Sequence, residues 1–374
     1  MAESDRDPAA TALTETAGRP LPRPHWLTRL VSVSVKLLTT VAGLAVFILA
    51  LELLKKGAAG IAPLFQTLHV DGVWDSLGMG WLMAYVVLSG SPVAAISLTL
   101  YSGQVISDIQ AFAMITGSRL GASFIVLFIG FLYYLRGHQR VASISIGILS
   151  LLVTATVYLP AMALGYASLR YGWLDGVQFG RPGALNSVID VVYDPVVNWL
   201  AATLPRWALF ILGILTLLTA FQIFDKALPE VKPESTGFQR IADLVYRPQV
   251  MLLLGLAVTS ITLSVSVSLS ILVPLSARGY IRRENLIPYI MGCNISTFID
   301  TLFAALLLNT PRAFTIVLTE MLSVGVLSLL ILLLIYGPYQ AAIEQLLEWT
   351  LRDRRTLALF ILLMTLVPLG LLLS

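Results

Sequence analysis

The sequence predicts an all-α polytopic membrane protein. Of its 374 residues, 57% are hydrophobic and only 12% are charged, and the mean hydropathy is +0.85. Because soluble domains carry about 25% charged residues, this composition excludes an ordinary soluble enzyme and a disordered chain. A helix of about 20 apolar residues crosses a bilayer core of about 30 Å. The clear candidates for such helices are 37–54, 141–167, 206–224, 311–337 and 356–373.

Charge and cysteine content exclude several kinds of site. The 24 basic and 21 acidic residues are spread along the chain, so no concentrated basic surface for nucleic acid is expected. The single cysteine, Cys293, excludes an internal disulfide and a cysteine-based metal cluster. The three histidines lie far apart, and the chain carries neither HExxH nor a phosphate-binding glycine loop. We therefore expect no enzymatic activity and no cofactor, with sodium at most as a transported ion.

Two further apolar regions, 75–135 and 248–309, are interrupted by Ser, Gly and Pro and by polar turns. Lipid cannot hydrogen-bond a freed backbone group, so non-helical backbone at membrane depth must be covered by protein or line a watery cavity. Interrupted segments in matching positions of two halves are typical of a transporter binding site. We expect a re-entrant helical hairpin and a broken transmembrane helix in each half. A pair of kinked helices without a ligand is the alternative.

An internal repeat relates the two halves. Segment 89–92 (Ser-Gly-Ser-Pro) precedes segment 264–267 (Ser-Val-Ser-Val) by 175 positions, and segment 117–123 precedes segment 292–298 by the same offset. This period is too long for a solenoid and fits two half-transporters. The repeats are expected at 37–167 and 206–337.

Lysine and arginine predict the orientation. With the amino terminus inside, seventeen of the 24 basic residues fall in inner loops and six in outer loops, which is the bias expected of cytoplasmic loops. Three crossings per half then invert the second repeat relative to the first. We expect an integral protein of the inner (plasma) membrane. Its remaining parts are a disordered cytoplasmic tail (1–36), an extracytoplasmic connecting loop (168–205), and a cytoplasmic segment with a final transmembrane helix (338–374).

Charged residues in apolar segments are the strongest site candidates. Arg119 lies within an apolar stretch, where a charge costs about 2.5–3.5 kcal/mol on insertion scales. Its guanidinium fork suits phosphate, sulfate or carboxylate. Asp300, in the equivalent segment of the second half, is the expected partner, so a static ion pair and an anion-contacting arginine are both open. Glu320 in another apolar run favours proton coupling as an option.

The serines of the two interrupted regions allow two interpretations. Hydroxyls and exposed carbonyls bind hard cations when several converge in a broken helix, and hydroxyls also bind anion oxygens. Ser264 and Ser268 are four residues apart, so a helix places both on one face. Serines in membrane helices also serve in helix packing or bond to their own carbonyls.

The second of these regions resembles a known family. The run Gly292-Cys293-Asn294-Ile295-Ser296-Thr297 follows a Ser-rich segment. This order of a Ser-rich segment and a Gly-x-Asn-Ile-x-Thr run is similar to that of the sodium-dependent phosphate cotransporters, the sodium/phosphate symporter family. That family has two inverted repeats. Each of that family's hairpins carries Gln-Ser-Ser-Ser, followed by Gly-Ala-Asn-Ile-Gly-Thr-Thr. The resemblance covers roughly 40–167 and 206–310.

The resemblance implies a secondary active transporter that symports a small anion such as phosphate with sodium or protons, by alternating access. The chain departs from the family pattern at three positions. Ser89 and Ser264 stand where the family has glutamine, and Arg119 stands where it has asparagine. These departures motivate the alternative, a transport-inactive membrane scaffold or regulator with the same fold.

The charged residues, the serines and the family resemblance together define the expected site and partners. Asp300 and Glu320 are expected to act in coupling or in an ion pair. The expected partners are a small inorganic or carboxylated anion and the lipid bilayer, without nucleic acid, and a homodimer is left open. The residues expected to bind substrate or ions are Ser89, Ser91, Arg119, Ser123, Ser264, Ser266, Ser268, Asn294, Ser296 and Thr297.

The topology is testable by cysteine labelling. In a Cys293→Ser background, a cysteine at Gly103 is expected to react with an impermeant maleimide added outside, and one at Gly279 only from inside. The physical reason is the excess of basic residues in the loops assigned to the inner face. Labelling of both positions from one side would remove the inverted-repeat interpretation.

Overall fold

The structure is a computed structural model that describes residues 25–135, 142–179, 183–227, 247–265, 267–269 and 285–374. All regular elements in these ranges are helices. Six helical segments have the length and composition to cross a membrane, which confirms the predicted all-α membrane class. They are Ser34–Gly60, Ile144–Tyr171, Arg206–Ala227, Leu286–Leu307, Pro311–Leu334 and Arg355–Leu372. Several predicted features lie outside the described residues: the tail to residue 24, the loop 136–140, Ser266, and the stretch 270–284 that includes Gly279.

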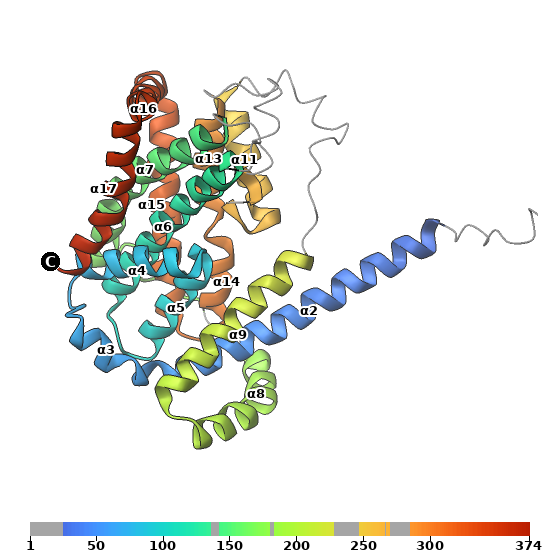
Figure 1. Ribbon diagram of the computed structural model, residues 1–374. Helices are drawn as coiled ribbons and strands as arrows, with labels where there is room; N and C mark the ends of the chain where they lie inside the picture. The colour runs from blue at the N-terminus through green and yellow to red at the C-terminus, as the bar shows by residue number, and fades with distance from the viewer. Residues whose placement is uncertain (1–24, 136–141, 180–182, 228–246, 266, 270–284) are drawn as a thin grey trace, which may run out of the picture.

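Figure 1 shows how the described helices are arranged. In chain order they are α2 (His25–Gly57), the 3-10 turn η1 (Ala58–Gly60), α3 (Ala62–Thr67), α4 (Val73–Val87), α5 (Gly90–Ser102), α6 (Asp108–Leu135), α7 (Ala142–Tyr171), α8 (Gly183–Thr203), α9 (Arg206–Ala227), α11 (Pro248–Thr262), α13 (Leu286–Ser296), α14 (Ile299–Leu307), α15 (Pro311–Leu334), α16 (Tyr336–Leu351) and α17 (Arg354–Leu372).

Helices α2 and α9 form an antiparallel pair that projects from one side of the other helices (Figure 1). A Cβ added at Gly57 would lie 2.5 Å from the backbone nitrogen of Phe210, and one at Gly43 would lie 3.1 Å from Ile223. Helix α2 begins at His25, inside the stretch expected to be a tail, because no proline or glycine interrupts the chain before Gly43.

Helix α8 occupies most of the stretch expected to be a connecting loop. Its inner face places Val197 against Leu53 of α2 and Leu209 of α9. Its other face leaves Val192 and Trp199 exposed. An amphipathic helix with an exposed apolar face is suited to lie in the interface between bilayer and water.

Two helices break at equivalent positions. Helix α4 ends before Leu88, whose φ is +55°, and α11 ends before Leu263, whose φ is +50°. Leucine rarely adopts this left-handed conformation. The two leucines are 175 positions apart, the offset of the sequence repeat, and each stands directly before a serine, Ser89 or Ser264.

Close backbone contacts recur at the same offset. A Cβ added at Gly117 of α6 would lie 2.0 Å from the carbonyl oxygen of Leu77 in α4. A Cβ at Gly292 of α13 would lie 2.0 Å from the carbonyl oxygen of Leu252 in α11. The reciprocal contacts are Gly80 with Met114 (2.0 Å) and Gly255 with Tyr289 (2.1 Å). Each pair of helices therefore packs backbone against backbone through two reciprocal glycines, and in the first pair Gly121 adds a further contact with the carbonyl oxygen of Trp81.

The expected break occurs in only one of the two matching transmembrane segments. In the second half, α13 ends at Ser296 and α14 begins at Ile299. The Tyr158 hydroxyl donates to the Asn294 carbonyl oxygen at 2.8 Å, which takes this acceptor out of the helical ladder. In the first half, the expectation of a broken helix is corrected: α6 is continuous from Asp108 to Leu135. The hydroxyls of Ser118 and Ser123 donate back to carbonyls of their own helix, and α4 covers its glycines.

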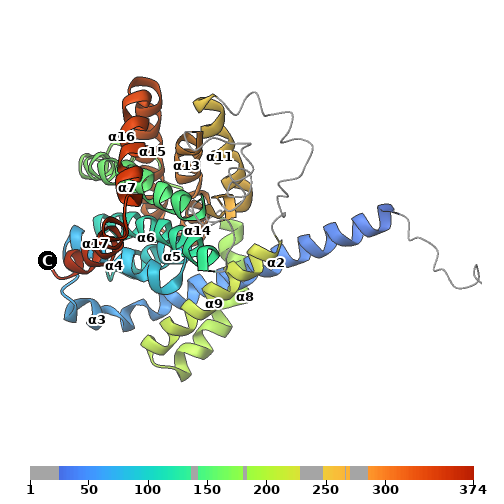
Figure 2. The same cartoon turned by 45° about the horizontal axis from the view of Figure 1, so that its top comes forward.

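The last helix, α17, packs against α4 (Figure 2). Trp81 donates through its indole nitrogen to the Tyr85 hydroxyl, which donates to the Met364 carbonyl oxygen; both distances are 2.8 Å. Asp353 caps α17 and accepts from the backbone N–H groups of Thr356 and Arg355. These hydrogen bonds lower the pKa of the Asp353 carboxyl.

The glycine contacts predict the cost of a single methyl group. Gly117→Ala and Gly292→Ala are each expected to destabilise the protein by about 1–3 kcal/mol, because a backbone must shift to admit the methyl. Gly337→Ala in α16 is the control, since no atom lies within 4 Å of its added Cβ. Thermal unfolding in detergent measures all three. Equal melting temperatures for Gly117→Ala, Gly292→Ala and Gly337→Ala would contradict the described packing.

Candidate functional site

Arg119 stands where the helix breaks of the two halves meet. Its side chain, projecting from α6, is only 4% exposed. Nη1 donates to the Ser91 hydroxyl at 3.1 Å and to the Thr297 hydroxyl at 3.2 Å. Ser91 lies in the first turn of α5, and Thr297 lies between α13 and α14. One guanidinium therefore joins a break in the first half to a break in the second.

The other terminal nitrogen of Arg119 faces α14. Nη2 donates to the Thr301 hydroxyl at 2.5 Å and lies 3.6 Å from Asp300 Oδ1. Thr301 in turn donates to Asp300 Oδ1 at 2.8 Å. The expected partnership of Arg119 with Asp300 is thus a contact through one oxygen, supported by a bridging hydroxyl, and not a two-pronged ion pair.

This cluster leaves hydrogen-bonding capacity unused. The guanidinium carbon of Arg119 lies 5.0 Å from the centre of the Phe298 ring, and the guanidinium is thereby covered on one side. Arg119 Nε and Asp300 Oδ2 are buried, and neither has a hydrogen-bond partner among the described residues. Buried polar groups are normally satisfied, so unsatisfied atoms on two charged side chains favour a site that takes a ligand or an ion.

Glu320 contacts α6, the helix that carries Arg119. Its side chain, from α15, is buried at 2% exposure, and Oε1 accepts from the Thr116 hydroxyl of α6 at 2.6 Å. Oε2 has no partner within the described part of the chain. Thr116 precedes Arg119 by three residues, so this carboxylate lies about one helical turn from the arginine.

Other predicted site residues bond elsewhere. Asn294 donates to the Thr154 hydroxyl of α7 at 3.1 Å. Ser268 lies 2.8 Å from the Tyr289 hydroxyl of α13. The hydroxyls of Ser123 and Ser296 donate to carbonyls of their own helices.

The serines at the two breaks differ from one another in their contacts. The Ser264 hydroxyl accepts from the backbone N–H of Val267 at 3.3 Å. Ser89 precedes α5 in an extended conformation and makes no side-chain capping hydrogen bond. The structure thus brings together Arg119, Ser91, Thr297 and Asp300, whereas Ser123, Ser264, Ser268, Asn294 and Ser296 make their hydrogen bonds with other groups.

Two contacts of Arg119 were not found from the sequence. Thr301 follows Thr297 by four residues and stands beside Asp300, and this spacing was the only sequence feature near it, although it does not indicate a contact with Arg119. The contact of Phe298 with Arg119 could not be predicted, because an apolar residue in an apolar segment does not indicate which charged group it packs against.

No protein-family model, curated protein or solved structure matches this chain. Among the described residues, no group of three or more His, Cys, Asp or Glu is arranged to hold a metal ion. The geometry around Arg119 therefore carries the functional proposal.

A double-mutant cycle tests the buried pair. Arg119→Leu and Asp300→Leu are each expected to destabilise the protein by about 3–5 kcal/mol, because each strands a buried charge. The double variant is expected to lose less than the sum of the two. Unfolding in detergent measures this coupling.

The matched control for this cycle is the half-buried pair Arg312 and Asp108, whose side chains are 40% and 25% exposed and whose closest atoms are 3.0 Å apart. Leucine substitutions there are expected to couple by about 0–1 kcal/mol, since water screens both charges. Additive losses at Arg119 and Asp300 would show that the two charges do not stabilise one another.

Proposed function

We propose that the protein is a cation-coupled secondary transporter of a small anion. The observation that carries this proposal is the buried Arg119 guanidinium, held by Ser91 of one half and by Thr297 and Thr301 of the other. Arginine binds oxyanions through its planar fork, and each of these hydroxyls is able to rotate and donate to an anion instead. The ligand class that fits is an oxyanion such as phosphate or sulfate, or a small carboxylate, in line with the resemblance to sodium/phosphate symporters.

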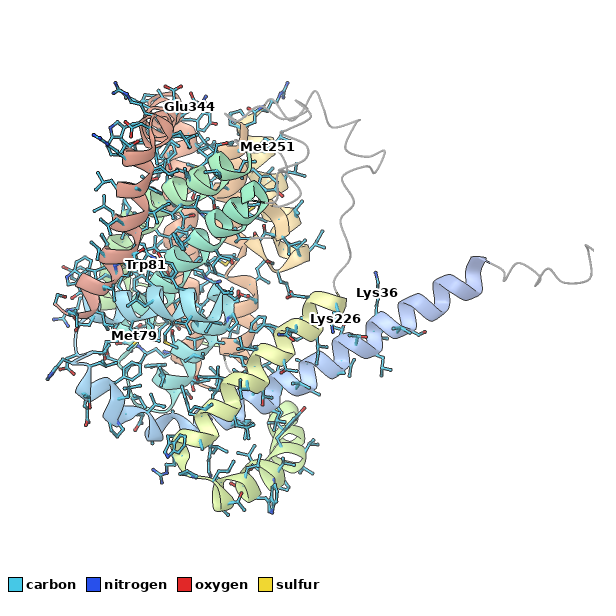
Figure 3. All side chains as sticks on the ribbon, in the orientation of Figure 1. Lys36, Met79, Trp81, Lys226, Met251 and Glu344 are labelled. Carbon is cyan, nitrogen blue, oxygen red and sulfur yellow. The ribbon has the colours of Figure 1, made fainter. Side chains whose placement is uncertain are left out.

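The proposed framework is a pair of inverted repeats whose interrupted regions form re-entrant hairpins. Three observations support it: the left-handed leucines, the reciprocal glycine contacts and the antiparallel pair α2–α9. Lys36 and Lys226 lie toward the same end of that pair (Figure 3), while Lys55, Lys56 and Arg206 lie toward the other end. Taking the end with Lys36 as cytoplasmic follows from the overall bias of basic residues.

Alternating access would proceed by moving the hydroxyls of the two halves against one another around Arg119. Asp300 and Glu320 are the proposed coupling carboxylates, because both are buried near Arg119 and each has one oxygen without a partner in the described residues. A proton or a sodium ion arriving at either carboxylate would weaken its hold on the arginine and favour anion binding. Sodium would additionally find backbone carbonyls at the break between α13 and α14.

A transport-inactive scaffold is the second candidate, and one observation favours it. The Arg119 guanidinium already occupies the hydroxyls of Ser91, Thr297 and Thr301. A site closed by its own side chain in this way would hold the two halves together without exchanging a ligand.

Uptake into proteoliposomes distinguishes the two candidates. Radiolabelled phosphate and sulfate would be offered under an inward sodium gradient, an inward proton gradient, and neither. We expect gradient-dependent uptake, and a loss of about 10- to 100-fold in apparent affinity with Arg119→Gln, because a charged hydrogen-bonding group is removed. Arg119→Lys is expected to retain part of the affinity, since it keeps the charge but not the fork.

Arg170→Gln is the matched control, because Arg170 is exposed at the end of α7. Its uptake is expected to equal that of the unchanged protein. Absence of uptake under every gradient, in protein that remains monodisperse, would favour the scaffold.

A further inference from the structure

A cavity opens beside the Arg119 cluster and shares Asp300 with it. It has a volume of about 270 Å³ and lies between α2, α9 and α14, next to the end of α11. Four phenylalanines and two carboxylates dominate its lining: Phe47, Phe221, Phe224, Phe303, Asp225 and Asp300. This volume admits a compact organic group of a few heavy atoms.

The aromatic part of the lining is a packed cluster. The Phe47 ring meets the rings of Phe221 and Phe224 edge to face, with centroids 5.6 and 5.9 Å apart. Phe303 on α14 is 45% exposed. The π-faces of such rings carry partial negative charge, so they attract a cation placed over them.

The acidic part of the lining lacks a full counter-charge. Asp300 is 7% exposed and touches Arg119 only through Oδ1, at 3.6 Å, while its buried Oδ2 has no partner among the described residues. Asp225 stands in the last turn of α9, on the other side of the cavity. The described residues that line the cavity include no lysine or arginine. The wall therefore places two carboxylates beside apolar rings. Asp225 is exposed, whereas Asp300 is buried, and a buried carboxylate oxygen without a partner is costly unless a cation reaches it.

We propose that this cavity binds a small organic ammonium ion. Carboxylates supply the counter-charge, and phenylalanine rings supply the apolar, electron-rich walls that recognise alkylated ammonium groups. A metal cation such as Ca²⁺ would need six or more oxygen ligands, which a wall of rings does not offer. An acyl chain would leave both carboxylates against hydrocarbon. The proposal goes beyond anion transport and does not depend on it.

Choline and its uncharged isostere test the proposal. In the isostere, dimethylbutanol, a carbon replaces the charged nitrogen, so shape is kept and charge is lost. Isothermal titration of the purified full chain in a non-ionic detergent measures the dissociation constant of each. Choline is expected to bind at least about tenfold more tightly, from the combined effect of ring faces and carboxylates. Equal affinities, or no choline binding to monodisperse protein, would overturn the proposal.

Two variants with matched controls locate the site. Asp225→Asn is expected to weaken choline binding about tenfold, and Phe303→Leu about threefold to tenfold, because charge and ring face are removed separately. The controls are Asp194→Asn on α8 and Phe314→Leu on α15, which do not line this cavity.

Wild-type choline affinity in both cavity variants would overturn the assignment to this cavity. Because the titration uses no gradient and no anion, its result is independent of the uptake experiment. Anion uptake without choline binding would contradict only the ammonium site, and choline binding without uptake would contradict only the transporter.

Discussion

The rest of the structure depends on the burial of one positive charge in an apolar helix. Arg119 cannot reach water, so protein groups must replace its hydration. The groups that do so come from two regions that are distant in sequence, the first turn of α5 and the segment 297–301, and they meet where helices begin or end. The breaks at Leu88 and between α13 and α14 therefore place Ser91 and Thr297 where their hydroxyls can accept hydrogen bonds from Arg119.

Glycine makes this convergence sterically feasible. Two glycines per helix pair let α4 approach α6, and α11 approach α13, to backbone contact. A third close approach, of Gly90 to the carbonyl oxygen of Ser118, sets the first turn of α5 against α6, where Ser91 meets Arg119. The reciprocal glycine contacts occur in both halves at the 175-residue offset of the sequence repeat, so the repeat corresponds to the same helix packing in each half.

Hydropathy and spacing predicted the membrane class, helices long enough to span, and the contact of Arg119 with Asp300. Such patterns report burial and local period, so they could not predict contacts that depend on the register between distant helices. Thr301 and Phe298 are of this kind. Helix α8 escaped prediction because Asp194 and Asn198 dilute its apolar face. The unbroken course of α6 was not predicted because Gly117 and Gly121, which look like helix breakers in the sequence, serve to pack this helix against the backbone of α4. The roles assigned to the serines and to Glu320 stay predictions.

Helix α8 has a mechanical consequence for the α2–α9 pair. One face of α8 packs on Leu53 and Leu209 at one end of the pair, and the other face exposes Trp199. Any vertical displacement of α2 and α9 would drag this apolar face into water or push its polar side into lipid. With α8 in the interface between bilayer and water, the pair would be held at one depth, and any rearrangement would have to move the other helices relative to it.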